Sequence, residues 1–202
     1  MSTIALDLQT DVVILPPPQL PPQASLVHAL SHRASSRAFS SEPVSAEWLS
    51  ALLWAAFGVN RPSTHGRTAP SAHNWQEMDL FVVLPQGAYR YDAHSHRLEL
   101  VKAEDLREAT GTQDYVQSAP VQLVYVANTD LATGVTSEER TFLIGVDAGC
   151  IAQNASLLCA SAGLNTVVRG LINRRLLAGK LGLKTTQRIA LAQSVGWPVG
   201  VE

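Results

Sequence analysis

The chain has 202 residues, the length of one domain or of one subunit whose core a partner completes. Hydrophobic residues make up 46% of it and charged residues only 16%, against roughly 25% in an average soluble domain, which excludes a disordered chain. Because so little charge is available to cover the surface, we expect apolar surface in a subunit interface or around a large cofactor. The 15 basic and 17 acidic side chains form no basic stripe, so nucleic acid is not an expected partner.

The cysteines and the amino terminus bear on the cellular compartment. Cys150 and Cys159 match no zinc motif and, on one helix, would lie about 13.5 Å apart, too far for a disulfide. This favours a reducing compartment, although a cysteine-poor periplasmic protein would have the same composition. The apolar run Val12–Leu15 is too short for a cleavable signal and has no basic residues before it. Since no unbroken run of roughly 18 apolar residues occurs, we expect no membrane span and a cytoplasmic protein.

The amino-terminal part combines a proline-rich segment with two helix patterns. Five of the seven residues from 16 to 22 are prolines, which favours an extended chain. We therefore expect residues 1–22 to form an N-terminal arm, as a linker or packed on its own or a partner subunit, and residues 23–202 to form a single domain. Helices are expected over about 25–33 and from the N-cap Ser45 to Gly58.

The remaining sequence alternates irregularly between strand and helix patterns. The polar stretch 60–74 has the length at which a loop is more often functional than idle. Strand patterns occur at 79–84, 88–91, 97–101, 121–126, 165–169 and 188–195, the second and third forming a hairpin. Helix patterns occur at about 137–162, which ends at Gly163 and is apolar on most faces, and at about 174–181. This order favours an α+β fold with a mixed sheet over a strict βαβ winding.

Several well-known site motifs are missing from the sequence. No G-x-G-x-x-G follows a strand, the spacing before Gly179-Lys180 does not fit a phosphate loop, and no G-x-S-x-G occurs. His94 and His96 would share one strand face, and His65 or His73 could join them. Zinc sites usually need three or four ligands with supporting contacts. We expect His94 and His96 to lie in a hairpin turn, and we expect no metal site.

The first segment with groups suited to a ligand is Arg33-Ala-Ser-Ser-Arg37. Its two arginines are four residues apart, which brings them to one side of a helical turn. With Ser35 and nearby backbone N–H groups, they could hold a phosphate through charge-assisted hydrogen bonds. The alternative is a solvated basic helix end.

Two further segments have similar potential. The stretch 67–76 is rich in hydroxyl, amide and imidazole groups, and its short side chains would let a planar ligand approach the backbone. It is either a binding loop or an ordered polar loop. The strand at 165–169 ends at Gly170, where an exposed amide could donate to a ligand and glycine permits close approach. An ordinary exit from a strand is the alternative here.

In this order, the three segments resemble the flavin-dependent nitroreductase family over nearly the whole chain. The motifs at 53–58, 60–62 and 67–71 are most similar to its compact SagB-like branch. The resemblance implies a three-layer α/β/α sandwich with a mixed, mainly antiparallel sheet. It also implies a homodimer with FMN sites between the subunits and a long central helix at the interface. That helix would contain Asp147, Gln153 and Asn154.

The same resemblance implies which residues bind FMN. Arg33, Ser35 and Arg37 would match the family's element that binds the FMN phosphate. The family's Pro-Ser-x-x-Asn loop, which reaches the flavin from the partner subunit, would be matched by Pro70, Ser71, Ala72 and Asn74, with Gln76 beside it. The strand end whose backbone N–H faces flavin N5 would be matched by Val168, Arg169 and Gly170. The chain lacks the basic residue that family members commonly carry after the final strand, and Arg188 is the candidate substitute.

The function implied is that of an FMN-dependent oxidoreductase. NADH or NADPH would pass a hydride to flavin N5 and leave, and an oxidised small molecule such as a nitroaromatic or quinone would then accept it in a ping-pong cycle. No side chain need act as a nucleophile, and no metal is required. Two alternatives stay open: a SagB-like dehydrogenase that acts in the oxidative direction, and a flavin-binding protein without turnover.

Overall fold

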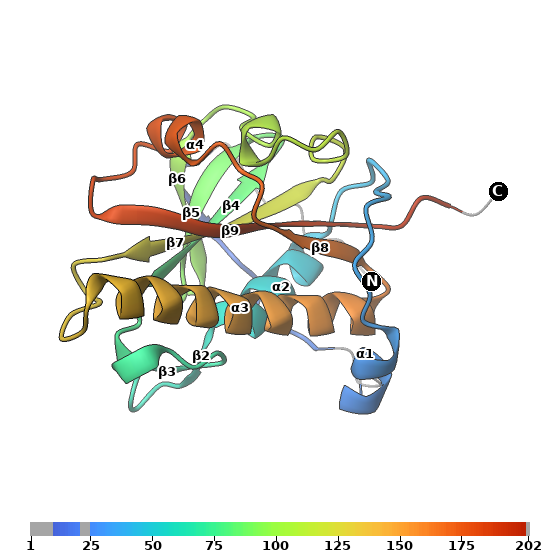
Figure 1. The fold of residues 1–202 in the computed structure, drawn as a ribbon. Helices are drawn as coiled ribbons and strands as arrows, with labels where there is room; N and C mark the ends of the chain where they lie inside the picture. Colours follow the sequence, from blue (N-terminus) through green and yellow to red (C-terminus); the bar gives the residue numbers. More distant parts are fainter. Residues whose placement is uncertain (1–9, 21–24, 201–202) are drawn as a thin grey trace.

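The computed structural model describes residues 10–20 and 25–200 as a sheet between two helical layers (Figure 1). The sequence-based arm at 1–22 therefore lies partly outside the described residues. The seven-stranded sheet has the order β1-β6-β5-β4-β7-β9-β8. Its strands are β1 (Val12–Ile14), β4 (Met78–Leu84), β5 (Gly87–Asp92), β6 (Arg97–Lys102), β7 (Val121–Asn128), β8 (Asn165–Arg169) and β9 (Gln187–Gly196). Each neighbouring pair is antiparallel.

Helices cover both faces of this sheet. On one face lie α1 (Leu26–His32), α2 (Ala46–Phe57) and α3 (Ser137–Ala162), and on the other lies α4 (Arg174–Lys180). A small hairpin, β2 (Val59–Arg61) and β3 (Gly66–Arg67), and two short 3₁₀ turns, η1 (Ala72–Asn74) and η2 (Glu108–Thr110), complete the described elements. The expected three-layer α+β fold with a mainly antiparallel sheet is confirmed.

The two helices with the clearest sequence punctuation begin and end where predicted. Ser45 caps α2 by accepting from the N–H of Trp48. Thr136 caps α3 through the N–H of Glu139, and Gly163 ends it with a φ of 73°, a left-handed conformation that glycine adopts without strain. Both cysteines lie on α3 as free thiols, and burial raises the pKa of Cys159 to about 12.

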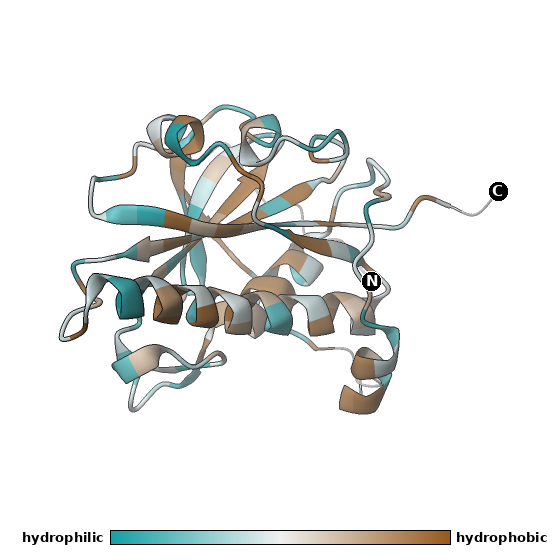
Figure 2. Ribbon diagram, in the orientation of Figure 1, coloured by the Kyte–Doolittle hydropathy of each residue, from teal (hydrophilic) through white to brown (hydrophobic). Residues whose placement is uncertain are grey.

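Buried side chains that alternate along the strands form the two larger hydrophobic clusters, which are the cores of the fold. Figure 2 shows hydrophobic residues recurring along the strands of the sheet and along α3. Leu80 of β4 packs with α2 and α3 in the larger core, whereas its neighbour Phe81 points to the smaller core beneath α4. The larger core also contains the fully buried Leu52, Leu53 and Tyr125. α2 and α3 are rich in apolar residues because both helices pack on this larger core.

The length and composition of α3 would also suit a membrane span over its most apolar window. Scattered polar residues interrupt its apolar ones, so α3 contains no unbroken apolar run of that length. Half of that window is buried inside the fold, and the buried residues belong to the larger core. Core helices of soluble proteins have the same pattern.

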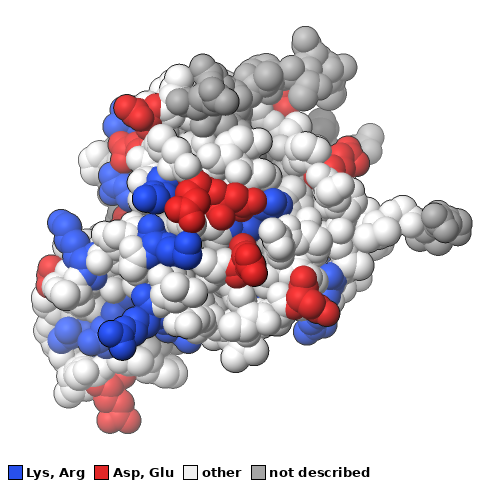
Figure 3. Space-filling model, turned by 90° about the horizontal axis from the view of Figure 1, so that it is seen from above, with Lys and Arg blue, Asp and Glu red and all other residues white. Residues whose placement is uncertain are grey.

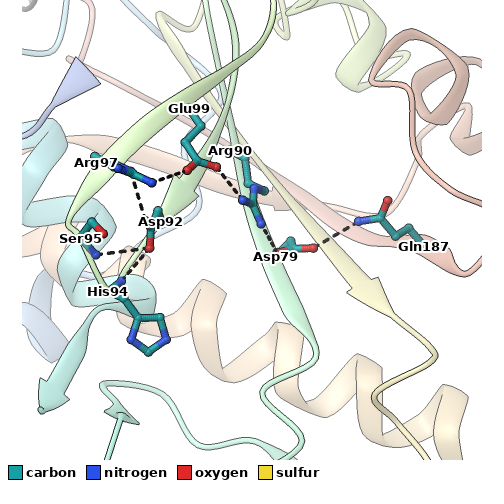
Figure 4. Close-up of polar contacts among 8 residues, drawn as sticks. All are labelled: Asp79, Arg90, Asp92, His94, Ser95, Arg97, Glu99 and Gln187. Carbon is teal, nitrogen blue, oxygen red and sulfur yellow. Dashed lines mark hydrogen bonds and ion pairs between the residues drawn. The ribbon is translucent and has the colours of Figure 1, made fainter. Parts of the chain in front are cut away.

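Ion pairs connect the neighbouring strands β4, β5 and β6 (Figure 4). Arg90 Nη2 on β5 lies 2.6 Å from Glu99 Oε2 on β6, and Arg97 Nη2 lies 2.8 Å from Glu99 Oε1. The hydrogen bond from Arg90 lowers the pKa of Glu99. Asp79 on β4 accepts from Gln187 on β9 at 3.2 Å. Seen from above, acidic and basic side chains interleave near the centre, and basic ones gather toward the lower left (Figure 3).

Part of the proline-rich arm is tied to the chain's own sheet. The run Val12–Ile14, considered in the sequence only as a signal segment, forms β1 and pairs with β6. Pro16 O, just beyond it, receives hydrogen bonds from Ser50 Oγ at 2.5 Å and His96 Nε2 at 3.1 Å. His96 Nε2 also lies 2.7 Å from Ser50 Oγ, and its Nδ1 lies 2.8 Å from the Tyr91 hydroxyl oxygen. With its hydrogen on Nε2, the ring donates to Pro16 O and Ser50 Oγ and accepts from Tyr91 on Nδ1. Burial lowers the pKa of His96, in keeping with this neutral form.

We expect His96→Ala to loosen this arm, because Pro16 O loses one of its two donors and the Tyr91 hydroxyl loses its acceptor. At about 1 kcal/mol per hydrogen bond, amide exchange at Leu15, which donates to the backbone of residue 96, should accelerate roughly tenfold or more. Hydrogen exchange by NMR measures this. The control is His94→Ala, which removes no hydrogen bond to residues 10–20, and equal exchange in both variants would contradict the assignment.

Candidate functional site

The basic segment begins where α1 ends. The N–H of Arg33 donates to Ala29 O as the helix C-cap, and residues 34–40 are irregular. The sequence argument that one helical turn brings Arg33 and Arg37 together is therefore wrong, because only the first borders the helix. Both arginines and Ser35 are exposed, and neither guanidinium has an ion pair or hydrogen bond among the described residues. Both side chains are thus free to bind an anion.

This segment runs beside β8, the last strand of the sheet. Ser36 N donates to Thr166 O at 2.9 Å, and Asn165 Nδ2 donates to Ala38 O at 2.7 Å. Since Thr166 directs its carbonyl to the outer edge, Val168 and Gly170 direct their N–H groups to that same edge. The distance from Thr166 to Gly170 is about 13 Å along the strand. The basic segment and these outward amides therefore form one continuous edge.

Gly170 leaves room at the open end of this edge. A Cβ there would meet only Leu191 Cδ2, at 4.0 Å, so packing within the chain does not require glycine. Within the described part of the chain, no group accepts from the Gly170 N–H. An exposed donor beside unfilled space is what a ligand approaching the backbone needs.

Arg169 has a different position from its neighbours. Its guanidinium is buried and donates to Thr110 O, Thr110 Oγ1, Gln122 Oε1 and Ser194 Oγ. These acceptors are neutral, and burial lowers the pKa of Arg169 to about 10, which still leaves it charged at neutral pH. Its side chain fixes β8 against β7, β9 and η2. Only the backbone of Arg169 is available to a ligand.

A cavity of about 560 Å³ lies between α3, α4 and β9. Leu191 lines it, and the Cδ2 of this residue is 4.0 Å from where a Cβ at Gly170 would lie. Its floor is mainly apolar, with Ile144 and Ile189 among its lining residues. Three arginines also line it: Arg174, Arg175 and Arg188. Arg174 donates to the carbonyls of Ile189 and Ala190 at 2.9 Å. Because Arg188 is near the start of β9, whereas Val195 pairs with Thr166, it does not replace the missing basic residue beside Arg33 and Arg37 in one chain.

The loop Pro70–Gln76 is ordered by its own hydrogen bonds. Gln76 N donates to Ser71 Oγ at 2.9 Å, and Gln76 Nε2 donates to Asn74 Oδ1 at 3.2 Å. His73, Asn74 and Gln76 have φ values of 50°, 54° and 48°, a left-handed conformation that costs energy for residues with a side chain. Backbone strain of this kind persists where the surroundings hold the loop, and it often marks a functional site.

α3 provides that support and also keeps the loop away from the basic segment. Ala72 N donates to Asp147 Oδ2 at 2.9 Å. Asp147 lies sixteen residues before Gly163, the residue that ends α3 next to β8, or about 24 Å along the helix. One chain therefore brings Arg33–Arg37 to the β8 edge but places the Pro70–Gln76 loop near the other end of α3 (Figure 1).

Glu77, which the sequence analysis did not single out, lies beneath this loop. It is 1% exposed, and Asp147 is 3% exposed. Burial raises the pKa of Glu77 to about 7, with a further contribution from Asp147. The available signal was an acidic residue directly before the buried strand β4, but its contact with α3 depends on the fold.

The histidines do not converge. His94 lies beside His65 with ring centroids 5.1 Å apart, His73 packs on Trp75, and His96 points to the proline-rich arm. Across residues 10–20 and 25–200, no three potential metal-binding side chains cluster together.

The similarity of this chain to known proteins extends over most of its length. The model of the nitroreductase family matches residues 30–197. A protein of Methanocaldococcus jannaschii named "putative nitroreductase" is 29% identical over 158 residues, which cover 73% of this chain and 79% of that protein.

Two solved structures share the fold. A protein from Ralstonia eutropha, also named "putative nitroreductase", has a TM-score of 0.90 and 43% identity, and the match covers 95% of this chain and 91% of that one. A chain of the E. coli microcin synthetase McbBCD complex with truncated pro-MccB17 bound has a TM-score of 0.72 and 20% identity, covering 91% and 78%. At that identity the likeness concerns the fold alone. The family match includes the basic segment, the loop and the β8 edge, and the chain belongs to the nitroreductase family of flavin-dependent oxidoreductases.

Proposed function

We propose that the protein binds FMN along the β8 edge and uses it to transfer a hydride from NADH or NADPH to an oxidised small molecule such as a nitroaromatic or quinone. The observation that carries this proposal is the juxtaposition of Arg33–Arg37 with the outward amides of Val168 and Gly170. Bound FMN would supply the hydride-transfer chemistry, and the chain supplies placement and electrostatics.

Arg33, Ser35 and Arg37 are suited to the phosphate. Arginine presents planar donors that match phosphate oxygens, and neither guanidinium is engaged within the described residues. With its N–H bound to Thr166 O, Ser36 holds the segment against β8 and keeps Ser35 beside the edge.

The amides of Val168 and Gly170 are suited to the flavin ring. A backbone donor held by a strand is fixed in direction, so it would orient a ring nitrogen and stabilise charge there without reorganisation. The buried contacts of Arg169 hold this strand end in place. The cavity beyond Gly170 is where a small-molecule substrate would have access.

A second copy of the chain would complete the site. Pro70, Ser71, Ala72, Asn74 and Gln76 lie too far along α3 from their own basic segment to join it. α3 also presents an exposed stripe of apolar and small residues suited to another helix: Phe142, Gly145, Val146 and Gly149. Phe142 is 68% and Val146 44% exposed, and a Cβ at either glycine would meet nothing within 4 Å. In the homodimer that we propose, this stripe packs on its copy and the loop reaches the partner's flavin.

Absorbance of the FMN-loaded protein tests the activity directly. We expect anaerobic NADH or NADPH to bleach the flavin bands, and steady-state kinetics with a quinone to give parallel double-reciprocal lines, because donor and acceptor would use one site in turn. Intersecting lines would exclude the ping-pong order. Bands that neither nucleotide bleaches would exclude the reductase direction while leaving flavin binding intact.

The phosphate contacts can be tested separately. The double variant Arg33→Ala, Arg37→Ala should weaken FMN binding at least about 100-fold, since each charge-assisted hydrogen bond contributes about 1.5–3 kcal/mol. Quenching of flavin fluorescence measures the Kd, and riboflavin, which lacks the phosphate, should bind both proteins equally. The matched control is Lys184→Ala at another exposed cation. Equal FMN affinity in the double variant would move the phosphate elsewhere.

The proposed interface predicts a mass in solution twice the 21.7 kDa of one chain. Phe142→Glu combined with Val146→Glu should give monomers with weakened FMN binding, because burying two carboxylates against a second helix is costly. Light scattering after size exclusion measures the mass. Val101→Glu, at an exposed valine on β6, is the control and should stay dimeric. A dimer that survives the double change would rule out this face of α3.

A further inference from the structure

The loop Pro70–Gln76 is held from below by a pair of buried carboxylates. Asp147 Oδ2 accepts from Ala72 N, so it anchors the middle of the loop directly. Glu77 follows Gln76 in the chain and directly precedes Met78, the first residue of β4. Both acids are more than nine-tenths buried, which distinguishes them from the surface acids of the β4–β6 ion pairs.

The pair contains more acceptors than donors. Neither side-chain oxygen of Glu77 has a hydrogen-bond partner among the described residues, and the neighbouring carboxyl group of Asp147 raises the pKa of Glu77 beyond the effect of burial. Two ionised carboxylates only accept, so this contact is favourable only when one of them carries a proton. A shared proton accounts for both the orphaned oxygens and the approach of like groups.

Basic side chains near the loop do not compensate this pair. Arg67, on β3, donates to Gln76 Oε1 and Phe57 O. Arg140, two turns before Asp147 on α3, forms no ion pair with either acid, and His73 turns to Trp75. Along the described segments, no lysine, arginine or histidine lies within ion-pair distance of Glu77 or Asp147.

We propose that Glu77 is a positioning residue that holds one proton between itself and Asp147, and that this proton fixes the Ala72 amide and with it the loop. Protonated Glu77 donates to the Asp147 carboxyl group, whose Oδ2 accepts from the Ala72 N–H. Loss of the proton places a second charge in the same buried space, and the contact between α3 and the loop weakens. The effect on FMN rests on the proposed function, whereas the effect on the loop does not.

The raised pKa of Glu77 fixes the direction of the pH dependence. Its pKa is about 7 in the fold and 4.5 as the reference value, so the folded state binds the proton more tightly. Stability from this group is complete below pH 4.5 and is lost as the pH rises to about 7. The loop should therefore be tightest in mildly acid solution.

The decisive experiment follows the Ala72 amide by ¹H–¹⁵N NMR in flavin-free protein between pH 5 and 9. All proteins carry His73→Gln, so that no ionisable side chain is adjacent to Ala72 in the sequence. We expect the Ala72 amide to shift with a midpoint near 7 and to exchange faster at high pH. Glu77→Gln should abolish the shift and keep the low-pH position throughout, and Asp147→Asn should displace the amide at every pH. In the control variant Glu108→Gln, which changes an exposed acid on η2, the Ala72 amide should shift with pH as it does in the parent.

A flat Ala72 signal in the parent, or an unchanged titration in Glu77→Gln, would overturn the proposal. FMN affinity supplies the second readout: it should fall several-fold from pH 6 to pH 8.5 in the parent and stay constant in Glu77→Gln. If Ala72 titrates as expected but FMN does not bind at any pH, the positioning pair stands and the proposed function fails.

Discussion

The candidate site depends on the unpaired outer edge of β8. In an antiparallel sheet, alternate residues of the last strand direct their backbone groups away from the sheet, and these groups need partners. The basic segment satisfies the first of them at Thr166, and the amides at Val168 and Gly170 remain available. The chemistry that we assign to this edge thus follows from strand geometry before any catalytic side chain is considered.

The buried side chain of Arg169 holds this edge in place through hydrogen bonds to the neighbouring strands and η2. Buried arginines usually pair with carboxylates, but Arg169 donates to four neutral acceptors from η2, β7 and β9. Because these acceptors are neutral, the guanidinium charge stays uncompensated within the sheet. It lies next to the strand end where we propose that the flavin ring binds. A Cβ at Gly111 would collide with this guanidinium, so the loop after η2 is shaped around it as well.

The sequence predicted local structure better than the meeting of distant residues. The ends of α2 and α3 followed from Ser45, Gly58 and Gly163, whose capping chemistry is local. β1 was missed because three residues with two exposed side chains form a strand only through β6. The helical turn considered for Arg33–Arg37 did not form for a related reason, since the chain after Arg33 is irregular and hydrogen-bonds to β8.

The site shows the same division. Residue types and order indicated the basic segment, the loop and the strand end, but not that α3 separates the loop from the other two. Glu77 gave little sign of its role, because its partner Asp147 lies seventy residues away in the chain. Burial and acid–acid contacts are properties of the packed layers, and one sequence does not specify them.

The pairing of β1 with β6 has a practical consequence. β1 and β8 are the two ends of a seven-stranded sheet, so six strand spacings, or about 29 Å, separate them. A reporter attached to the exposed side chain of Ile14 on β1 would therefore lie at the edge of the sheet remote from the basic segment and Gly170. Such a label could immobilise the protein while leaving its β8 edge accessible.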